Sequence, residues 1–208
     1  ASMYPSFIVN YGVSPHHLSS KVFLGIVEWL RTTRLDAKHN GRKLEADALK
    51  IVINRIYGAL NDAMDYLYDP ECTYTVTINL QLLLCNLIES FELNGFDVLS
   101  ANTDGLLIRR PNDRLDLFNH ICKEWEDYSK LSLDTEVFEK YCRSAVNDYI
   151  AVGYGFYDAL QEYNRCGVWI DSKSNTYTTR QAIEDKFIKF KGYFLQDPEY
   201  NLSLIHIS

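Results

Sequence analysis

A polar turn between two short apolar segments is the feature that most constrains how this chain folds. The turn is Asn102-Thr103-Asp104-Gly105, preceded by the apolar pair 98–99 and followed by the apolar residues 106–108. Two apolar runs bounded by Asn, Asp and Gly predict two strands joined by a tight turn. A carboxylate on such a turn, that of Asp104, is placed to bind a hard cation. Alone, the motif is also ordinary hairpin chemistry, because Asn, Asp and Gly all favour turns.

Helical periodicity on both sides of this turn predicts a mixed architecture. Four segments repeat apolar side chains at helical spacing: residues 19–38, 44–60, 77–93 and 115–128. The first two are joined by a turn at residues 39–41, which predicts an antiparallel helical hairpin, and the third should end at Asn94-Gly95. Residues 149–152 are typical of a further strand. The expected fold class is α+β with an antiparallel sheet.

Composition narrows the class of protein. The 208 residues are 47% hydrophobic, enough to bury a sizeable core. The five Cys form no Cys-x-x-Cys pair, so neither a zinc site nor a disulfide framework is expected, and a reducing compartment is the simplest inference. No apolar run reaches membrane-spanning length and no basic-then-apolar leader opens the chain, so no membrane partner is expected.

Three segments together resemble the polymerase motifs of family B DNA polymerases. Residues 2–6, followed by 11–15, are similar to the family's Asp-x-x-Ser-Leu-Tyr-Pro-Ser. Residues 50–58 resemble Lys-x-x-x-Asn-Ser-x-Tyr-Gly, with Arg55 in place of Ser, and this match is the most specific of the three. Residues 102–105 resemble Asp-Thr-Asp-Ser. The resemblance covers nearly the whole chain.

The resemblance implies a polymerase palm with an antiparallel sheet and a two-helix fingers hairpin. The implied divisions are palm over residues 1–18, fingers over 19–60, palm again over 61–185 and the start of the thumb over 186–201. The last segment, 202–208, resembles the translation of a transposon end used in preparing sequencing libraries. Because its apolar residues alternate, an edge strand is the alternative.

The implied reaction is transfer of a deoxynucleotide from a dNTP to a primer 3′-hydroxyl, with two Mg²⁺ ions, or Mn²⁺, neutralising charge. Asp104 would be a catalytic metal ligand. The family's second Asp would stand three residues before Ser2, outside this chain, so the chain alone is expected to be inactive. Asn102 replaces the motif's first Asp and offers a cation less charge. Gly105 in place of Ser is expected to loosen the turn without touching the carboxylate.

The first motif would contact the incoming nucleotide. Backbone N–H groups of Ser2 and Met3 would hold the triphosphate tail, since successive amides in a turn bind anions. The ring of Tyr4 would exclude a 2′-hydroxyl, the group that distinguishes ribonucleotides. A core Tyr before a Pro is the structural alternative.

The middle motif would supply further contacts. Lys50, Asn54 and Tyr57 share a helical face. Lys50 would meet the triphosphate, Asn54 the sugar and phosphates, and Tyr57 the minor groove, where Gly58 allows close approach. A solvated surface Lys is the alternative for Lys50.

Other charged residues have weaker support. On the opposing helix, Arg34 and Lys38 are expected to face the triphosphate; Arg31 is the alternate to Arg34, and a solvated charge is an equal reading. Three residues are predicted to touch the DNA primer-template: Tyr149, Lys189 and Lys191. His16 and His17 have no acidic or Cys partner at ligand spacing and are expected to be plain loop residues.

A phage or other viral polymerase is favoured by the short fingers and the Asn-Thr-Asp-Gly variant. The expected partners are therefore primer-template DNA, dNTPs and replication accessory proteins in the cytoplasm of an infected cell. The net charge of −7 opposes nucleic-acid binding, which depends on Lys and Arg contacts with phosphates. A non-catalytic nucleic-acid-binding or replication-scaffold module with a degenerate palm therefore stays open. A reverse transcriptase is disfavoured, because those enzymes lack the signature of residues 50–58.

Overall fold

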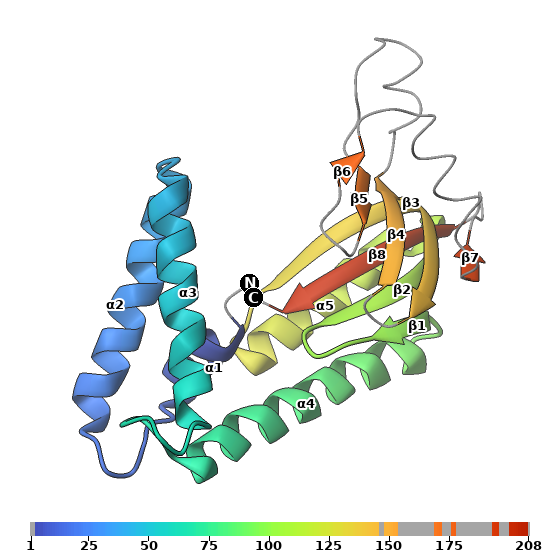
Figure 1. The fold of residues 1–208 in the computed structure, drawn as a ribbon. Coiled ribbons are helices and arrows are strands. Elements are labelled where there is room, and N and C mark those ends of the chain that lie inside the picture. The colour runs from blue at the N-terminus through green and yellow to red at the C-terminus, as the bar shows by residue number, and fades with distance from the viewer. Residues whose placement is uncertain are drawn as a thin grey trace. The chain divides into compact units, whose positions relative to one another are not determined.

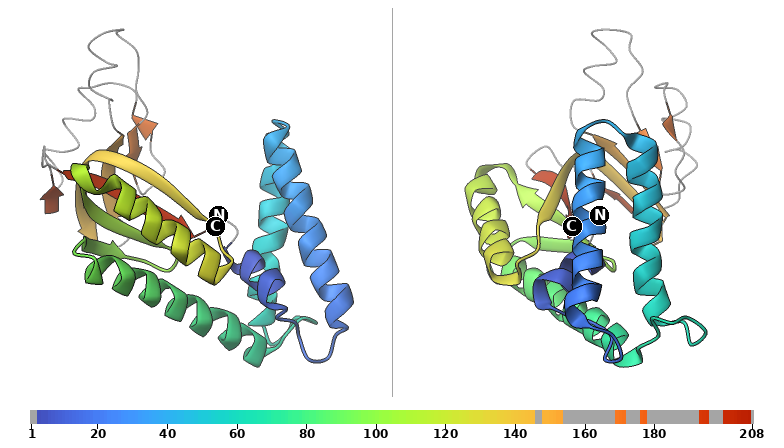
Figure 2. Two further views of the ribbon diagram at one scale, coloured as in Figure 1. Left: turned by 180° about the vertical axis from the view of Figure 1, so that it is seen from behind. Right: turned by 90° about the vertical axis from the view of Figure 1, so that its left-hand side faces the viewer.

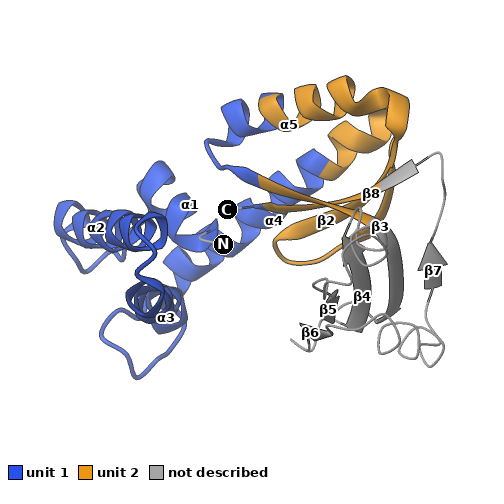
Figure 3. Ribbon diagram, turned by 90° about the horizontal axis from the view of Figure 1, so that it is seen from above, with its two compact units in different colours: residues 1–87, 124–133, 207–208 blue, residues 88–123, 134–206 orange. Residues whose placement is uncertain are grey.

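The computed structural model describes residues 3–145, 148–153, 169–171, 176–177, 193–195 and 200–207. The chain forms two compact units, coloured separately in Figure 3. The first unit comprises residues 1–87, 124–133 and 207–208, and the second comprises residues 88–123 and 134–206. The helices, shown in Figure 1, are α1 (Met3–Tyr11), α2 (Ser20–His39), α3 (Lys43–Leu60), α4 (Pro70–Leu93), α5 (Leu115–Ser129) and the short 3-10 helix η1 (Asn112–Arg114).

An antiparallel pair of long helices, α2 and α3, dominates the first unit (Figures 1 and 2). The chain reverses between them at Asn40 and Gly41, and Gly41 adopts a φ of +70°, a conformation that only glycine adopts without strain. Helix α1 packs against both long helices. Their shared core contains Phe7, Ile8, Val27, Leu30, Ile53 and Leu60. The predicted helical hairpin is confirmed, with each boundary within one residue.

Helix α1 was not predicted. Its sequence, Met-Tyr-Pro-Ser-Phe-Ile-Val-Asn-Tyr, is nearly all apolar and lacks a helical repeat. Pro5 is compatible with the helix because it lies in the first turn, where its missing N–H group is not needed. Burial of Met3, Phe7 and Ile8 stabilises the segment. Tertiary packing therefore decides its structure.

Helix α4 begins at Pro70, earlier than the predicted start at residue 77. The reason is the Asp69-Pro70 pair, because Asp caps a helix and Pro suits its first position. The predicted end is confirmed: Gly95 has a φ of +73°, and its N–H donates to the carbonyl of Glu92 at 2.9 Å. The N–H of Phe96 donates to the carbonyl of Phe91 at 3.0 Å, which completes a Schellman motif.

Among the described helices, α4 alone has the length and apolar composition to cross a membrane. The expectation that no segment reaches this length is therefore wrong for α4. A buried stripe on the helix repeats at helical spacing, through Val76, Leu80, Leu84 and Leu87. A core helix of a soluble protein passes the same test of length and composition.

An antiparallel sheet forms most of the second unit. Its strands are β1 (Asp97–Ala101), β2 (Gly105–Pro111), β3 (Leu133–Ala145), β4 (Asp148–Gly153), β5 (Trp169–Asp171), β6 (Thr176–Tyr177), β7 (Tyr193–Leu195) and β8 (Tyr200–Ile207). Their order is β1-β2-β8-β3-β4-β5-β6, and β7 also pairs with β3. The predicted strand at residues 149–152 is confirmed within β4. The fold is thus mixed α+β with an antiparallel sheet, as expected.

The segment at the end of the chain lies inside this sheet. Strand β8 pairs with β2 along its whole length, from Gly105 opposite His206 to Pro111 opposite Tyr200. Strand β3 follows β8 on its other side, so β8 is an interior strand and not an edge strand. Its side chains Leu202 and Leu204 pack with three others in an apolar cluster: Leu99, Leu107 and Phe138.

An aromatic cluster joins the helix ends of the second unit. The rings of Phe91 and Phe118 lie 5.2 Å apart, and Phe96 meets Phe91 edge to face at 5.5 Å. The guanidinium of Arg110 on β2 lies 5.6 Å from the Phe118 ring, and burial lowers the pKa of Arg110. Arg114 lies 4.6 Å from the Phe96 ring. These contacts place the start of α5 against the face of β2 that carries Arg110.

Candidate nucleotide-binding and metal-binding residues

Asp104 lies in the turn between β1 and β2, as predicted, and is half-buried. The turn closes when the N–H of Asn102 donates to the carbonyl of Gly105 at 3.0 Å. The side-chain oxygen of Asn102 accepts a hydrogen bond from the N–H of Asp104 at 3.1 Å. Asn102 therefore holds the backbone of Asp104 in an Asx-type turn, a task that needs an acceptor oxygen and no charge. An Asp at residue 102 could accept the same hydrogen bond, so the contact is compatible with Asn and does not explain the departure from the acidic motif.

Gly105 is required by close packing against β8. A Cβ atom at this position would lie 2.9 Å from the carbonyl oxygen of Ile205, 2.9 Å from His206 Nδ1 and 3.2 Å from Asn102 Oδ1. Real Cβ atoms do not approach a backbone oxygen so closely. Glycine at this position therefore permits β2 and β8 to approach each other.

The structure brings the first and second motifs together in the first unit. The ring of Tyr4 stacks on the ring of Tyr57, with centroids 4.0 Å apart and planes 8° from parallel. The two residues come from α1 and α3. Lys50 is exposed about two turns before Tyr57, and Asn54 is exposed about one turn before it, on the same helical face. Motif residues far apart in sequence therefore form one surface.

Thr77 contacts the candidate site residue Tyr57, and sequence reasoning did not single it out. Its Oγ1 lies 2.7 Å from the hydroxyl of Tyr57 and donates to the carbonyl of Thr73 at 2.8 Å. Through this contact α4 fixes the rotation of the Tyr57 ring that stacks on Tyr4. A Thr inside an apolar helix carries no signal of its distant partner, so only packing could reveal it.

The charged residues of α2 and α3 differ in their surroundings. Arg31 forms a bidentate pair with Glu28, at 2.8 and 3.0 Å. Arg34, one turn further along α2, is half-buried. Lys38 is exposed near the end of α2.

Arg55, which replaces the motif's Ser, contacts the loop that follows α3. Its Nη2 lies 3.2 Å from Asp62 Oδ2 and 3.0 Å from Asp65 Oδ2. The N–H of Met64 and then the guanidinium of Arg55 lower the pKa of Asp62. Arg55 therefore orders the loop of residues 61–69.

The structure gives fewer contacts for the remaining predicted site residues. Tyr149 is in β4, opposite Arg143 of β3. Ser2, Lys189 and Lys191 lie outside the described residues, and Met3 is buried at the start of α1. Asp104 belongs to the second unit and the Tyr4–Tyr57 pair to the first. Within the described residues, no three His, Cys, Asp or Glu side chains gather around a metal-sized site.

Comparison with solved structures gives the class of fold. The chain is similar to the family B DNA polymerase of Pyrobaculum calidifontis with a TM-score of 0.54 and 18% identity, over 74% of this chain and 25% of that chain. At this identity the likeness shows the fold.

Curated relatives show a distant similarity to DNA polymerases. The chain is 27% identical over 165 residues to a DNA polymerase of Thermococcus gorgonarius, a match that covers 64% of this chain and 21% of the relative. It is 29% identical over 75 residues to DNA polymerase II of Escherichia coli, covering 36% and 10%. No family model matches the chain. The chain is therefore distantly similar to family B DNA polymerases over part of its length, and it spans about a fifth or less of these curated relatives.

Proposed function

We propose that this chain is the palm and fingers portion of a longer, template-directed DNA polymerase that adds dNTPs to a primer 3′-hydroxyl. The observation that carries the proposal is the stacking of Tyr4 on Tyr57. It joins two motifs that each resemble nucleotide-binding segments of family B polymerases. By helical spacing, Lys50 and Asn54 share the face of α3 that carries Tyr57. The similarity to polymerases from three organisms supports the same assignment.

The residues of the first unit would bind and select the nucleotide. Lys50 would attract the triphosphate as a point charge, and Asn54 would contact the sugar and phosphates. The Tyr4 ring, held flat against Tyr57, would leave no room for a 2′-hydroxyl. Arg34 would add a second positive charge from α2. Tyr57, held by Thr77, would lie near the new base pair.

Asp104 would be a ligand for Mg²⁺ or Mn²⁺. A half-buried carboxylate on a turn fixed by Asn102 fits the hard oxygen ligands these ions prefer. The ions supply charge neutralisation at the phosphates when bound. A second carboxylate is needed to hold two metal ions, and we propose that it lies on a segment upstream of this chain. The chain by itself is accordingly proposed to be inactive.

Primer extension by the longer polymerase that contains this chain tests the proposal. Asp104→Asn is expected to lower kcat by more than about a thousandfold, because a charge-stabilising group is lost at the reacting phosphates. Asp113→Asn is the matched control: it removes an exposed carboxylate of η1 in the same unit and should leave kcat unchanged. Equal activity of the two variants would remove Asp104 from the reaction.

A non-catalytic DNA-binding or replication-scaffold module is the second candidate. The neutral Asn102 and the net charge of −7 favour it, because both reduce the resemblance to an active polymerase. The same assay separates the two functions. A full-length protein that binds primer-template but extends it with neither Mg²⁺ nor Mn²⁺ would be the scaffold. The viral origin, the accessory partners and the infected-cell cytoplasm remain part of the leading proposal.

A further inference from the structure

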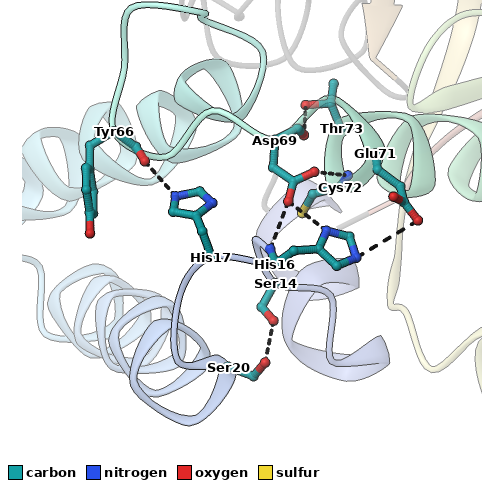
Figure 4. A network of polar contacts seen from close by, with 9 residues as sticks. All are labelled: Ser14, His16, His17, Ser20, Tyr66, Asp69, Glu71, Cys72 and Thr73. Carbon is teal, nitrogen blue, oxygen red and sulfur yellow. Dashed lines mark hydrogen bonds and ion pairs between the residues drawn. The ribbon is translucent and has the colours of Figure 1, made fainter.

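Two adjacent histidines form hydrogen bonds that connect the two loops at the base of the α2–α3 pair. His16 and His17 lie in the loop of residues 12–19, which leads from α1 into α2. The backbone N–H of His16 donates to Asp69 Oδ2 at 2.8 Å, and its ring Nδ1 lies 2.8 Å from the same oxygen (Figure 4). The expectation that these histidines are plain loop residues is thus corrected, because the acidic partner lies 53 positions away in sequence.

Asp69 is the point where three elements meet. Its Oδ1 accepts the N–H of Cys72 at 3.0 Å and so caps α4. Its own N–H donates to the carbonyl of Leu60, the last residue of α3, at 2.9 Å. Its Oδ2 holds His16 and through it the entry to α2. One buried carboxylate therefore connects α4, the end of α3 and the loop before α2.

His17 makes a second link between the same loops. Its Nε2 lies 2.8 Å from the carbonyl oxygen of Tyr66, and its ring meets the Tyr66 ring edge to face at 5.7 Å (Figure 4). Tyr66 belongs to the loop of residues 61–69, which Arg55 also contacts through Asp62 and Asp65. We call these four residues, His16, His17, Tyr66 and Asp69, the histidine clasp.

The charges around His16 make it the group that titrates. The hydrogen bond that His16 donates to Asp69 and the charge of Asp69, with a smaller contribution from Glu71 at 4.0 Å, raise the pKa of His16. Burial would raise the pKa of Asp69, but hydrogen bonds from Cys72 and His16 outweigh it and lower that pKa to about 2. The remaining titratable neighbours are His17 along the loop, Tyr66 against it, and the Cys72 thiol, whose pKa burial and then Asp69 raise to about 11. Asp69 therefore stays charged and Cys72 stays neutral while His16 gains or loses its proton.

We propose that the histidine clasp is a proton-sensitive positioning element that fixes the base of the α2–α3 pair against α4. Protonated His16 holds Asp69 as an ion pair, and the clasp weakens as the pH rises through the raised pKa of His16. Because α3 carries Lys50 and Asn54, loosening its base reduces the affinity for the incoming nucleotide. This last step rests on the proposed polymerase function, whereas the clasp rests only on contacts within the first unit.

NMR titration of the whole 208-residue chain tests the clasp without any assay of activity. The ring signals of His16 should report a pKa above the ordinary value of about 6.5. Asp69→Asn should return that pKa toward the ordinary value while keeping the cap of α4, since Asn caps helices as well as Asp. His39→Gln, at the far end of α2, is the matched control and should change nothing. An unshifted His16 that ignores Asp69→Asn would overturn the proposal.

Steady-state primer extension by the longer polymerase tests the link to the nucleotide. The KM for dNTP should rise roughly two- to fivefold as His16 loses its proton, with a smaller change in kcat, the range for a partly exposed ion pair. His16→Gln should give the raised KM at every pH, and His16→Lys should restore the low one. A KM that follows the same pH profile in wild type and His16→Gln would overturn the positioning role. If the wild type extends no primer, the polymerase function fails, and the NMR result alone decides the clasp.

Discussion

At the scale of single residues, Gly105 illustrates how a motif departure can be structural. The carbonyl of Ile205 and the ring of His206 occupy the space that a side chain at residue 105 would need. Gly105→Ala is expected to destabilise the protein by about 1–3 kcal/mol, because an added methyl group must push β2 and β8 apart. Chemical denaturation followed by circular dichroism measures the change.

Gly25→Ala is the control for that substitution. Gly25 is inside α2, and a Cβ atom there meets nothing within 4 Å. The change should raise stability by up to about 1 kcal/mol, because alanine favours a helix over glycine. If both alanine variants shift the unfolding midpoint in the same direction, close packing at Gly105 is not the reason for its glycine.

At the scale of elements, the start of α4 depends on Asp69. Because Asp69 ionises, its contribution to the free energy of unfolding depends on pH. Asp69→Ala is expected to cost about 1 kcal/mol of unfolding free energy, because the cap to the Cys72 N–H is lost, whereas Asp69→Asn keeps it. A lowered folded-state pKa stabilises the protein above the ordinary Asp value of about 3.9, and the gain is lost as pH falls through about 2. Between about pH 5 and about pH 2, the denaturation midpoint should therefore fall more steeply for wild type than for Asp69→Asn.

The helices show which elements the sequence could predict and which it could not. Periodicity places α2, α3 and α5 within about one residue of their observed ends, because their buried faces repeat at helical spacing. It misses the first turns of α4, because the apolar repeat begins only later in the helix. The start is marked instead by Asp69 and Pro70. It also misses α1, whose helix depends on packing against α2 and α3. The motif residues Tyr4, Tyr57 and Asp104 could be found by resemblance, but Thr77 and the His16–Asp69 contact join positions that no local pattern relates.

At the scale of the whole molecule, the sheet of the second unit depends on the last strand of the chain. β8 lies between β2 and β3, and Ile205 within it is fully buried. Ile205→Ala is expected to cost about 2–5 kcal/mol, because it opens a cavity between packed elements. Leu115→Ala, at a half-exposed position of the same unit, is the control and should change stability by no more than about 0.5 kcal/mol. Equal unfolding midpoints for the two variants would mean that β8 does not belong to the sheet, and the alternating apolar pattern of residues 202–208 would then carry no structural information.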